Sequence, residues 1–281
     1  MGSIRPEFRG VEASRPKWRQ DAQWQFTQTA DPGWMPGDGA NDGGAWKDHK
    51  HIDIAPYENG RAAILNYKLL VSTFIPRPIA FVSTRSKDGS TTNLAPFSYA
   101  QMMTHDPPLF VIGFTGGFAT SKDTLKNLLE SQECTINIVS EHFLEAANAA
   151  GTVAPYGVSE WAFTGLTPAP SKDVKADRVA EAIFSIEGKL VDAKEVDSRA
   201  NPGQKSASLV TIEGVRFWAR EDAINKDKSF LDPNILRPMA RLGGITYGRI
   251  LEAIELPRPE WKTFEQDVKE AGLYKSKLDS Q

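Results

Sequence analysis

The sequence predicts a mainly β protein in which an antiparallel barrel or sandwich carries flanking helices. Segments with the apolar character or the alternation of strands outnumber the segments with helical spacing. Turn residues recur between these segments. Short strands that follow one another with turn residues between them are typical of antiparallel sheets, to which a few helices are added.

Five segments are expected to be strands, because each is apolar and aromatic-rich or alternates along its length. They are residues 78–84, 108–114, 134–139, 182–191 and 208–219. The first strand is followed by Lys87-Asp88-Gly89, whose residue types are those of a tight turn.

Four segments have the spacing or the end signals of helices. They are residues 124–131, 141–150, 233–241 and 261–274. Gly151 follows the second of them, and Pro233 opens the third, as proline often does at the first helical position. In the fourth, Trp261, Phe264 and Val268 share one face.

The chain divides into an irregular arm of residues 1–59, a body of residues 60–255 and a tail of residues 256–281. The arm is rich in Gly, Asp, Gln and Pro, yet it holds four of the seven tryptophans: Trp18, Trp24, Trp34 and Trp46. Free tails are poor in aromatic residues. We therefore expect the arm to pack its indoles on the body or on a partner subunit, with only about the first dozen residues free.

Composition excludes several function classes. The 281 residues carry a net charge of −3, and no basic run suggests nucleic-acid binding. No apolar run is long enough to cross a membrane. Cys134 is the only cysteine, which excludes an intrachain disulfide. We expect a cytoplasmic protein without nucleic-acid or membrane partners.

Small polar side chains gather near one loop that leads into a helix. They are Ser83, Thr84, Asn93, Ser98, Ser121 and Thr124. The loop, residues 116–124, also holds Lys122, and a helix N-terminus with a lysine is a ready site for a phosphate. The alternative is that Ser121 or Asp123 simply caps the helix. Because its charge would repel a phosphate, Asp123 is assigned to capping in either case.

Other motifs point to no separate chemistry. Neither a G-x-G-x-x-G nor a Walker A sequence occurs, and no metal site is expected, since the loop 38–43 lacks calcium ligands at the required positions. No G-x-S-x-G elbow occurs, so a serine hydrolase is disfavoured. Cys134 alternates with core residues, so it is expected to point into the core and not to act as a nucleophile. His105, in His105-Asp106-Pro107-Pro108, is either structural or close to a ligand.

A series of motifs resembles one known family. The stretch from Pro76 to Thr84 (PRPIAFVST), the stretch from Asn93 to Tyr99 (NLAPFSY), and Lys122-Asp123-Thr124 resemble the signature of the flavin reductase-like, FMN-binding split-barrel proteins. Further similar pieces follow in family order and end at Arg241-Leu242-Gly243-Gly244. The resemblance covers about residues 65–250, and the arm resembles that of the longer, fungal-type members.

The resemblance implies a six-stranded antiparallel split β-barrel, a homodimer, and FMN at the subunit interface. Ser83 and Thr84 would bond to the flavin or its phosphate, and Asn93 and the backbone of Ala95 would contact the isoalloxazine edge. Three residues would complete the phosphate and ribityl contacts: Ser98, Lys122 and Thr124. Ser121 is assigned to the same cofactor-binding set. The reaction would move a hydride from NADH or NADPH to FMN and then to an acceptor, a small-molecule substrate.

The sequence departs from the expected pattern at Ala100, where an aromatic residue is expected in relatives. Together with Met102 and Met103 it would leave a softer apolar wall for a bulky aromatic acceptor. This keeps open a dedicated biosynthetic tailoring enzyme, with His105 and Tyr99 as candidates for proton transfer. A third alternative is a flavin- or ligand-binding module without catalysis.

Overall fold

The structure is a computed structural model, and it describes residues 6–273. Parts of two expectations lie outside these residues. Residues 1–5 of the N-terminal segment that was expected to be free are not described. Residue 274, the last of the expected tail helix, and the rest of the tail to residue 281 are not described either. Within the described part of the N-terminal segment, Pro6–Ala13 forms helix α1.

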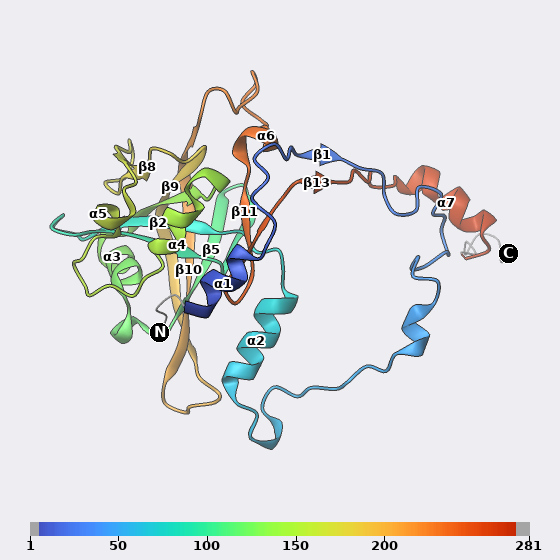
Figure 1. Ribbon diagram of the computed structural model, residues 1–281, viewed down its shortest axis with the longest axis horizontal. Coiled ribbons are helices and arrows are strands. Elements are labelled where there is room, and N and C mark those ends of the chain that lie inside the picture. Colours follow the sequence, from blue (N-terminus) through green and yellow to red (C-terminus); the bar gives the residue numbers. More distant parts are fainter. Residues whose placement is uncertain (1–5, 274–281) are drawn as a thin grey trace.

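The body is built on one antiparallel sheet of seven strands in the order β3-β2-β6-β9-β10-β5-β4 (Figure 1). The strands are β2 Ala80–Arg85, β3 Thr92–Phe97, β4 Ala100–His105, β5 Pro108–Thr115, β6 Glu133–Ile138, β9 Phe184–Asp197 and β10 Lys205–Ala219. This confirms the mainly β class with flanking helices and the antiparallel split barrel, with seven strands where the resemblance implied six. The turn at Lys87-Asp88-Gly89 is also confirmed, since it joins β2 to β3 and the Gly89 N–H donates to the Ser86 carbonyl at 2.9 Å.

The barrel is split because its two edge strands, β3 and β4, do not pair with each other in the described chain. Only Ser98 and Tyr99 separate these strands in the sequence, so the chain passes from one edge of the sheet to the other within two residues. The Tyr99 carbonyl accepts a hydrogen bond from the Gly113 N–H at 2.7 Å, which ties this link to β5. The seam of the barrel therefore lies at Ser98-Tyr99.

Alternation along β2 divides the core into two clusters. Val82 faces a cluster that also holds Ile112 and Leu125, whereas Phe81 faces a second cluster with Leu94. All five side chains are at most 2% exposed. Burying each one contributes about 1.5–3 kcal/mol. The first cluster fills the space between the sheet and α3, and the second packs the sheet against α4 and α5.

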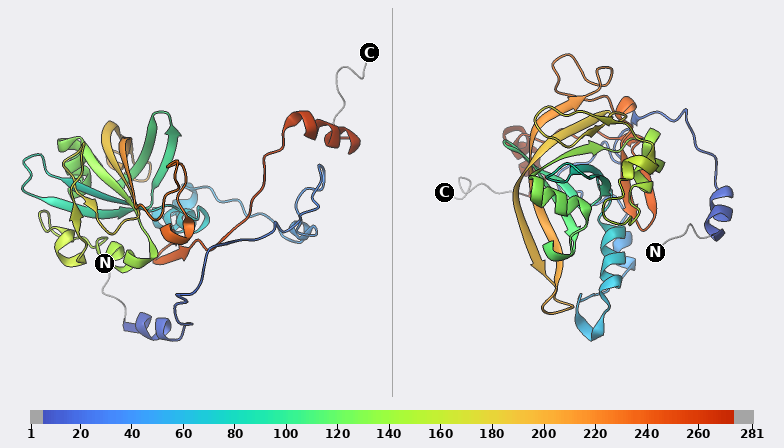
Figure 2. Two further views of the ribbon diagram at one scale, coloured as in Figure 1. Left: turned by 90° about the horizontal axis from the view of Figure 1, so that it is seen from above. Right: turned by 90° about the vertical axis from the view of Figure 1, so that its left-hand side faces the viewer.

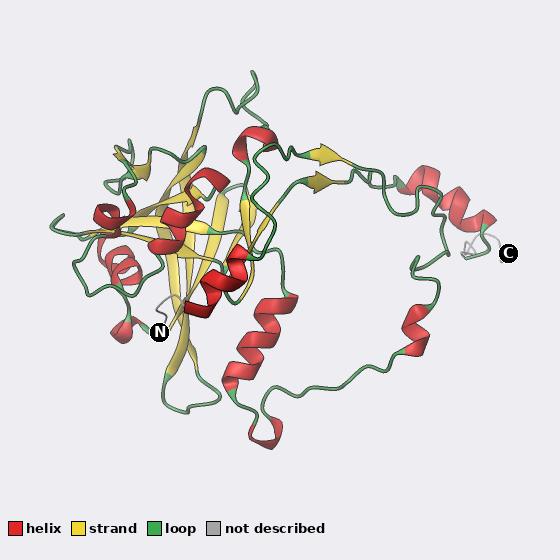
Figure 3. Cartoon of the chain, viewed as in Figure 1, coloured by secondary structure: helices red, strands yellow, loops and turns green. Residues whose placement is uncertain are grey.

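Helices of the body lie around the sheet, whereas α7 lies apart from it at the end of the tail (Figure 3). They are α2 Ala63–Thr73, α3 Asp123–Ser131, α4 Leu144–Ala149, α5 Glu160–Thr164, α6 Pro233–Leu236 and α7 Trp261–Glu270. Four short 3-10 turns accompany them: η1 Ala45–Asp48, η2 Glu58–Gly60, η3 Phe118–Thr120 and η4 Glu141–Phe143. The helix expected over 141–150 is therefore divided into η4 and α4. Within residues 6–273, no helix combines the length and the apolar character that crossing a bilayer requires.

The helix expected over residues 233–241 is wrong in its second half. Helix α6 ends at Leu236, Arg237 takes a left-handed conformation with φ of 43°, and β11 Met239–Gly243 follows. Pro238 disfavours a helical conformation for the residue before it and lacks an N–H to continue the helix. β11 pairs with β12 Thr246–Arg249. The remaining short strands are β7 Pro168–Ala169, β8 Arg178–Val179, and a pair that joins the arm to the tail.

The arm and the tail leave the body together (Figures 1 and 2). They are joined by a parallel pair of short strands, β1 Gln25–Phe26 and β13 Glu252–Ala253. Of the four arm indoles, only that of Trp24 is half-buried, and those of Trp18, Trp34 and Trp46 stay exposed. The guanidinium of Arg249 lies 4.2 Å from the Trp18 ring centroid, but the body of the same chain does not bury the indoles of Trp18, Trp34 and Trp46.

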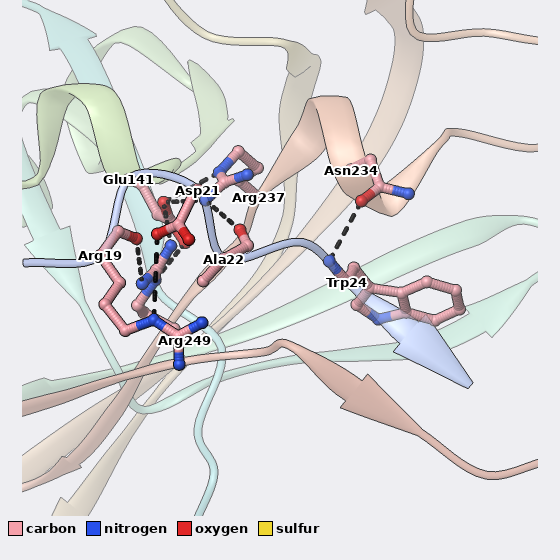
Figure 4. Close-up of polar contacts among 8 residues, drawn as sticks. All are labelled: Arg19, Asp21, Ala22, Trp24, Glu141, Asn234, Arg237 and Arg249. Atoms are coloured by element: carbon pink, nitrogen blue, oxygen red, sulfur yellow. Dashed lines mark hydrogen bonds and ion pairs between the residues drawn. The ribbon is translucent and has the colours of Figure 1, made fainter. Parts of the chain in front are cut away.

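An ion cluster fixes the base of the arm (Figure 4). The carboxylate of Glu141 accepts hydrogen bonds from Arg249 Nε at 2.6 Å and from Arg237 Nε at 2.8 Å. The same guanidinium groups donate to arm carbonyls, Arg249 to Arg19 and Arg237 to Ala22, each at 3.0 Å. Burial alone would raise the pKa of Glu141, but the hydrogen bonds from the two arginines hold it below its usual range. Glu141 thereby connects the body to the arm.

Candidate functional site

A cavity of about 210 Å³ opens at the N-terminus of α3, and we call it the α3 cavity. Its lining comes from β3, from the end of β5, from the first turn of α3 and from the loop after α4. The lining residues with polar or aromatic groups suited to a ligand include Asn93, Ala95 (through its backbone), Phe97, Phe114, Lys122 and Thr124. The rings of Phe97 and Phe114 lie 4.6 Å apart, so one wall is aromatic.

The N-terminus of α3 is not capped by a side chain, which corrects one expectation. Lys122 occupies the cap position, and no side chain accepts a hydrogen bond there. Asp123 is the first residue of the helix and Ser121 precedes the cap, so neither performs the capping expected of it. The free N–H groups of the first turn, the positive end of the helix and the charge of Lys122 favour an anion at this wall of the cavity, against the opposing charge of Asp123, which also lines it.

A buried hydrogen-bond network holds Asn93 in the floor of the α3 cavity. Its side-chain oxygen accepts a hydrogen bond from Thr124 Oγ1, and its nitrogen donates to Glu160 Oε2 at 2.8 Å. The backbone N–H of Leu94 donates to the same carboxylate oxygen at 3.0 Å. Thr84 lies behind Asn93 and accepts from Asn127 Nδ2 at 3.3 Å. The network orients Asn93 and Thr124, and Thr84 supports them without lining the cavity.

A second cavity, of about 390 Å³, adjoins the first, and we call it the arginine cavity. It shares Pro96, Phe97, Phe114, Thr115 and Gly151 with the α3 cavity, so the two are neighbours at the seam of the barrel, and together we call them the hollow. Its other polar lining residues are Tyr67, Arg77, Ser98, Tyr99, Asn148, Arg241 and Tyr247.

Backbone pairing brings Arg77 and Arg241 together. The Arg77 N–H donates to the Arg241 carbonyl at 3.1 Å, and the Arg241 N–H donates to the Arg77 carbonyl at 2.9 Å. Only glycine fits at position 243 beside them, because its φ is 108° and a Cβ there would lie 2.6 Å from the Val71 carbonyl oxygen of α2. The glycine thus lets β11 approach α2, which also contributes Tyr67 to the cavity.

Two tyrosine hydroxyls in the arginine cavity, those of Tyr99 and Tyr247, stay protonated near neutral pH. Burial raises the pKa of Tyr99, and it also raises that of Tyr247 despite the nearby charge of Arg241. The hydroxyl of Tyr247 donates to Asn148 Oδ1 at 2.8 Å. The hydroxyl of Tyr99 can therefore donate a hydrogen bond to a bound molecule, whereas the single proton of the Tyr247 hydroxyl is already donated to Asn148.

The structure brings together six of the ten residues that the sequence singled out. Asn93, Ala95, Lys122 and Thr124 line the α3 cavity, and Ser98 and Tyr99 line the arginine cavity. Ser83 is buried in β2, and neither it nor Ser121 lines either cavity.

His105 lies apart from the hollow. It is exposed at the end of β4, next to the turn into β5, and lines neither cavity. Ala100, where a softer wall for a bulky acceptor was expected, packs against the barrel core instead, and Met102 and Met103 are exposed. Among the described residues, no group of three or more His, Cys, Asp or Glu side chains is placed to hold a metal ion.

Sequence reasoning missed Tyr67, Arg77, Glu160, Arg241 and Tyr247. Arg77 and Arg241 stood in motifs that were used only to mark the family, in PRP and in RLGG. The available signal was the presence of arginine in both motifs. That their side chains share one cavity depends on the pairing between the segment before β2 and β11.

Comparison with known proteins agrees with this architecture. The family model described as "Flavin reductase like domain" matches residues 71–233. Nitrilotriacetate monooxygenase component B from Bacillus cereus is 31% identical, with a TM-score of 0.68, and the match covers 74% of this chain and all of that one. The 2-nitrobenzoate 2-nitroreductase of Pseudomonas fluorescens is also 31% identical, with a TM-score of 0.63 over 75% of this chain and 96% of that one.

A split barrel domain from Shewanella frigidimarina matches 75% of this chain and all of its own, with a TM-score of 0.62 and 22% identity, which supports the fold. The arm and the tail lie outside the residues that the family model matches. From its matched sequence, its open seven-stranded sheet and its solved neighbours, the chain belongs to the flavin reductase-like domain family.

Proposed function

We propose that the protein is an FMN-dependent oxidoreductase that moves a hydride between a nicotinamide donor, bound flavin and an organic acceptor. One observation carries the proposal: an uncapped helix N-terminus with Lys122 opens into a cavity with an aromatic wall. The two neighbours at 31% identity support it, since one is a monooxygenase component and the other a nitroreductase.

The residues present fit FMN. Lys122 and the free N–H groups at the start of α3 would hold the phosphate, since a helix N-terminus favours an anion. The apolar surface of Phe97 and Phe114 would receive the isoalloxazine, and Asn93 and the backbone of Ala95 would meet its polar edge. The network behind Asn93 fixes its amide before the cofactor arrives, which lowers the entropy lost on binding.

Flavin, when bound, supplies the hydride transfer, and the chain supplies binding, orientation and the exclusion of water. Hydride transfer needs no acid–base residue of the protein. Where an acceptor also takes up a proton, Tyr99 is placed to donate a hydrogen bond to it, because burial raises its pKa and keeps the hydroxyl protonated. The exposed His105 lines neither cavity and is not assigned this role.

We also propose that two copies pair with the flavin site at their interface. Apolar side chains point outward from α2 and from the residue after it: Ile64 and Leu70 are 54% and 62% exposed, and Phe74, just beyond the helix, is 79% exposed in the single chain. A helix that is apolar on most of its surface is normally buried. A second copy laid over α2 would cover these side chains and, through Tyr67, close the arginine cavity. The exposed arm tryptophans offer further surface for the same partner.

The test is a flavin-binding measurement followed by reduction. The purified protein should take up FMN stoichiometrically, elute as a dimer by light scattering, and be bleached by NADH or NADPH without oxygen. Failure to take up FMN overturns the proposal. Bound FMN that no nicotinamide reduces favours a binding module, and reduction without transfer to free flavin favours a dedicated tailoring enzyme. If the protein elutes as a monomer but takes up FMN normally, only the proposed dimer is overturned.

A further inference from the structure

We propose that Arg77 and Arg241 form the binding site for the carboxylate of an aromatic acid in the arginine cavity. The proposal deepens the proposed function, on which it rests for the role of that acid as the acceptor. Its physical basis is a pair of guanidinium groups that share a hollow without a carboxylate to neutralise them.

Arg77 is almost completely buried, with 6% of its surface exposed. Its Nη1 donates to the carbonyls of Val71 and Phe74 at 2.7 and 2.8 Å, which stabilises the C-terminal end of α2. This structural role accounts for one nitrogen. The buried Nε has no hydrogen-bond partner. An unmade hydrogen bond at a buried charged group is costly, so Nε is a candidate to donate to a ligand.

Arg241, the backbone partner of Arg77, also has one nitrogen bound to a carbonyl and a buried nitrogen without a partner. Its Nη2 donates to the Gly244 carbonyl at 2.6 Å, and its guanidinium stacks on the Tyr247 ring at 4.3 Å. The buried Nη1 has no hydrogen-bond partner. Each arginine therefore has a buried N–H-bearing nitrogen without a hydrogen-bond partner, and the two residues pair directly through their backbones.

No acid balances this charge. The lining of the arginine cavity contains no Asp or Glu, and among the ion pairs of residues 6–273 none includes Arg77 or Arg241. The arginines at the base of the arm differ, since Arg237 and Arg249 both bind Glu141. Arg77 is buried and Arg241 is half-buried, and both line the same cavity, so a bound anion would balance their charge and use their free donors.

The shape and the neighbours of the cavity favour an aromatic acid over a small inorganic anion. Tyr67, Tyr99 and Phe97 supply aromatic surface, and about 390 Å³ is far more than one inorganic ion fills. The planar fork of arginine matches a carboxylate. Because Phe97 and Phe114 also line the α3 cavity, an acid held by the arginines would extend toward the proposed flavin site.

The test uses the full-length protein loaded with FMN, and benzoate as the probe, with neutral benzamide as its isostere. Binding is measured by calorimetry and by the change in flavin absorbance. Benzoate should bind at least tenfold more tightly than benzamide. Arg241→Gln should weaken benzoate binding at least tenfold and leave FMN affinity within twofold. Arg199→Gln, the same charge change at the exposed tip of the β9–β10 hairpin, should change neither.

The outcomes separate this inference from the proposed function. If FMN binds but benzoate and benzamide bind equally, or Arg241→Gln binds benzoate normally, the carboxylate site is refuted and the oxidoreductase stands. If Arg241→Gln loses FMN instead, the arginines hold the flavin and the inference is also refuted. Arginine-dependent benzoate binding to protein that takes up no FMN would retain the site and refute the oxidoreductase. Should Arg241→Gln not fold, Arg241→Lys keeps the charge without the fork and should show an intermediate loss.

Discussion

Replacement of Glu141 by glutamine tests whether the ion cluster at the base of the arm stabilises the fold. The carboxylate accepts from Arg249 Nε and Nη2 at 2.6 and 3.0 Å and from Arg237 Nε at 2.8 Å. The glutamine side chain would keep one oxygen acceptor but lose the charge. Both guanidinium groups would then remain near a neutral amide, while their bonds to Arg19 and Ala22 depend on the same positions.

The size of the effect is set by burial. The side chains of Glu141, Arg249 and Arg237 are 8%, 15% and 25% exposed. Breaking a buried ion pair costs about 3–5 kcal/mol, and partial exposure of the arginines reduces that loss, so we expect ~2–3 kcal/mol. For a domain of this size that corresponds to a fall of roughly 5–10 °C in the melting temperature.

The pH dependence of this stabilisation has a definite sign. Because the pKa of Glu141 in the folded chain lies below its ordinary value of 4.5, the ionised carboxylate stabilises the fold above that value. The stabilisation is lost as the pH falls through the folded pKa. The difference in unfolding free energy between wild type and Glu141→Gln should therefore be full at pH 7 and should narrow below pH 4.5.

Calorimetric melting at pH 7 and at a series of acid pH values measures both quantities. Glu145→Gln, an exposed change on the neighbouring helix α4, is the matched control and should have the same melting temperature as the wild type. Equal melting of wild type and Glu141→Gln at pH 7 would refute the reasoning, and so would a difference that stays constant into the acid range.

Three further predictions address the site and the core. Lys122→Gln should raise the dissociation constant for FMN about tenfold, roughly 1.4 kcal/mol, and should change the dissociation constant for riboflavin, which lacks the phosphate, by no more than about twofold. Lys226→Gln, an exposed change of the same kind, is the control. Equal losses of affinity for both flavins would contradict the assignment. His105→Ala should leave kcat/KM within about twofold, because the side chain lines neither cavity, and a tenfold fall would return His105 to the mechanism. Burial raises the pKa of the Cys134 thiol to about 12, so a disulfide reagent at pH 8 should label it only after denaturation, and rapid labelling of the native protein would contradict its core position.

The sequence was a good guide where function depends on local order along the chain. Asn93, Ala95, Lys122 and Thr124 lie in motifs whose residues stay close in space, since β3 and the start of α3 form two walls of one cavity. The five expected strands correspond to β2, β5, β6, β9 and β10, whereas the edge strands β3 and β4 were not among those expected. The helix expected over 233–241 is too long because Pro233 favours a helix start, whereas Pro238 within the same segment ends it.

The remainder of the site could not be derived from local patterns. The pairing of Arg77 with Arg241 joins segments at opposite ends of the body, and the presence of Tyr67 depends on how α2 packs on β11. His105 shows the reverse error. A histidine next to two prolines and a buried strand has the features of a site residue, but the position of the β4–β5 turn directs it to solvent.

The β1–β13 pair has a consequence for how the arm can move. Because β1 is held near residue 25 and α2 begins at Ala63, the intervening chain is a closed loop and not a free tail. A loop fixed at both ends has already lost much of the conformational entropy that a free segment would lose on docking. Trp34 and Trp46 are therefore presented within a restricted volume, and a partner that contacts them meets a partly preorganised surface.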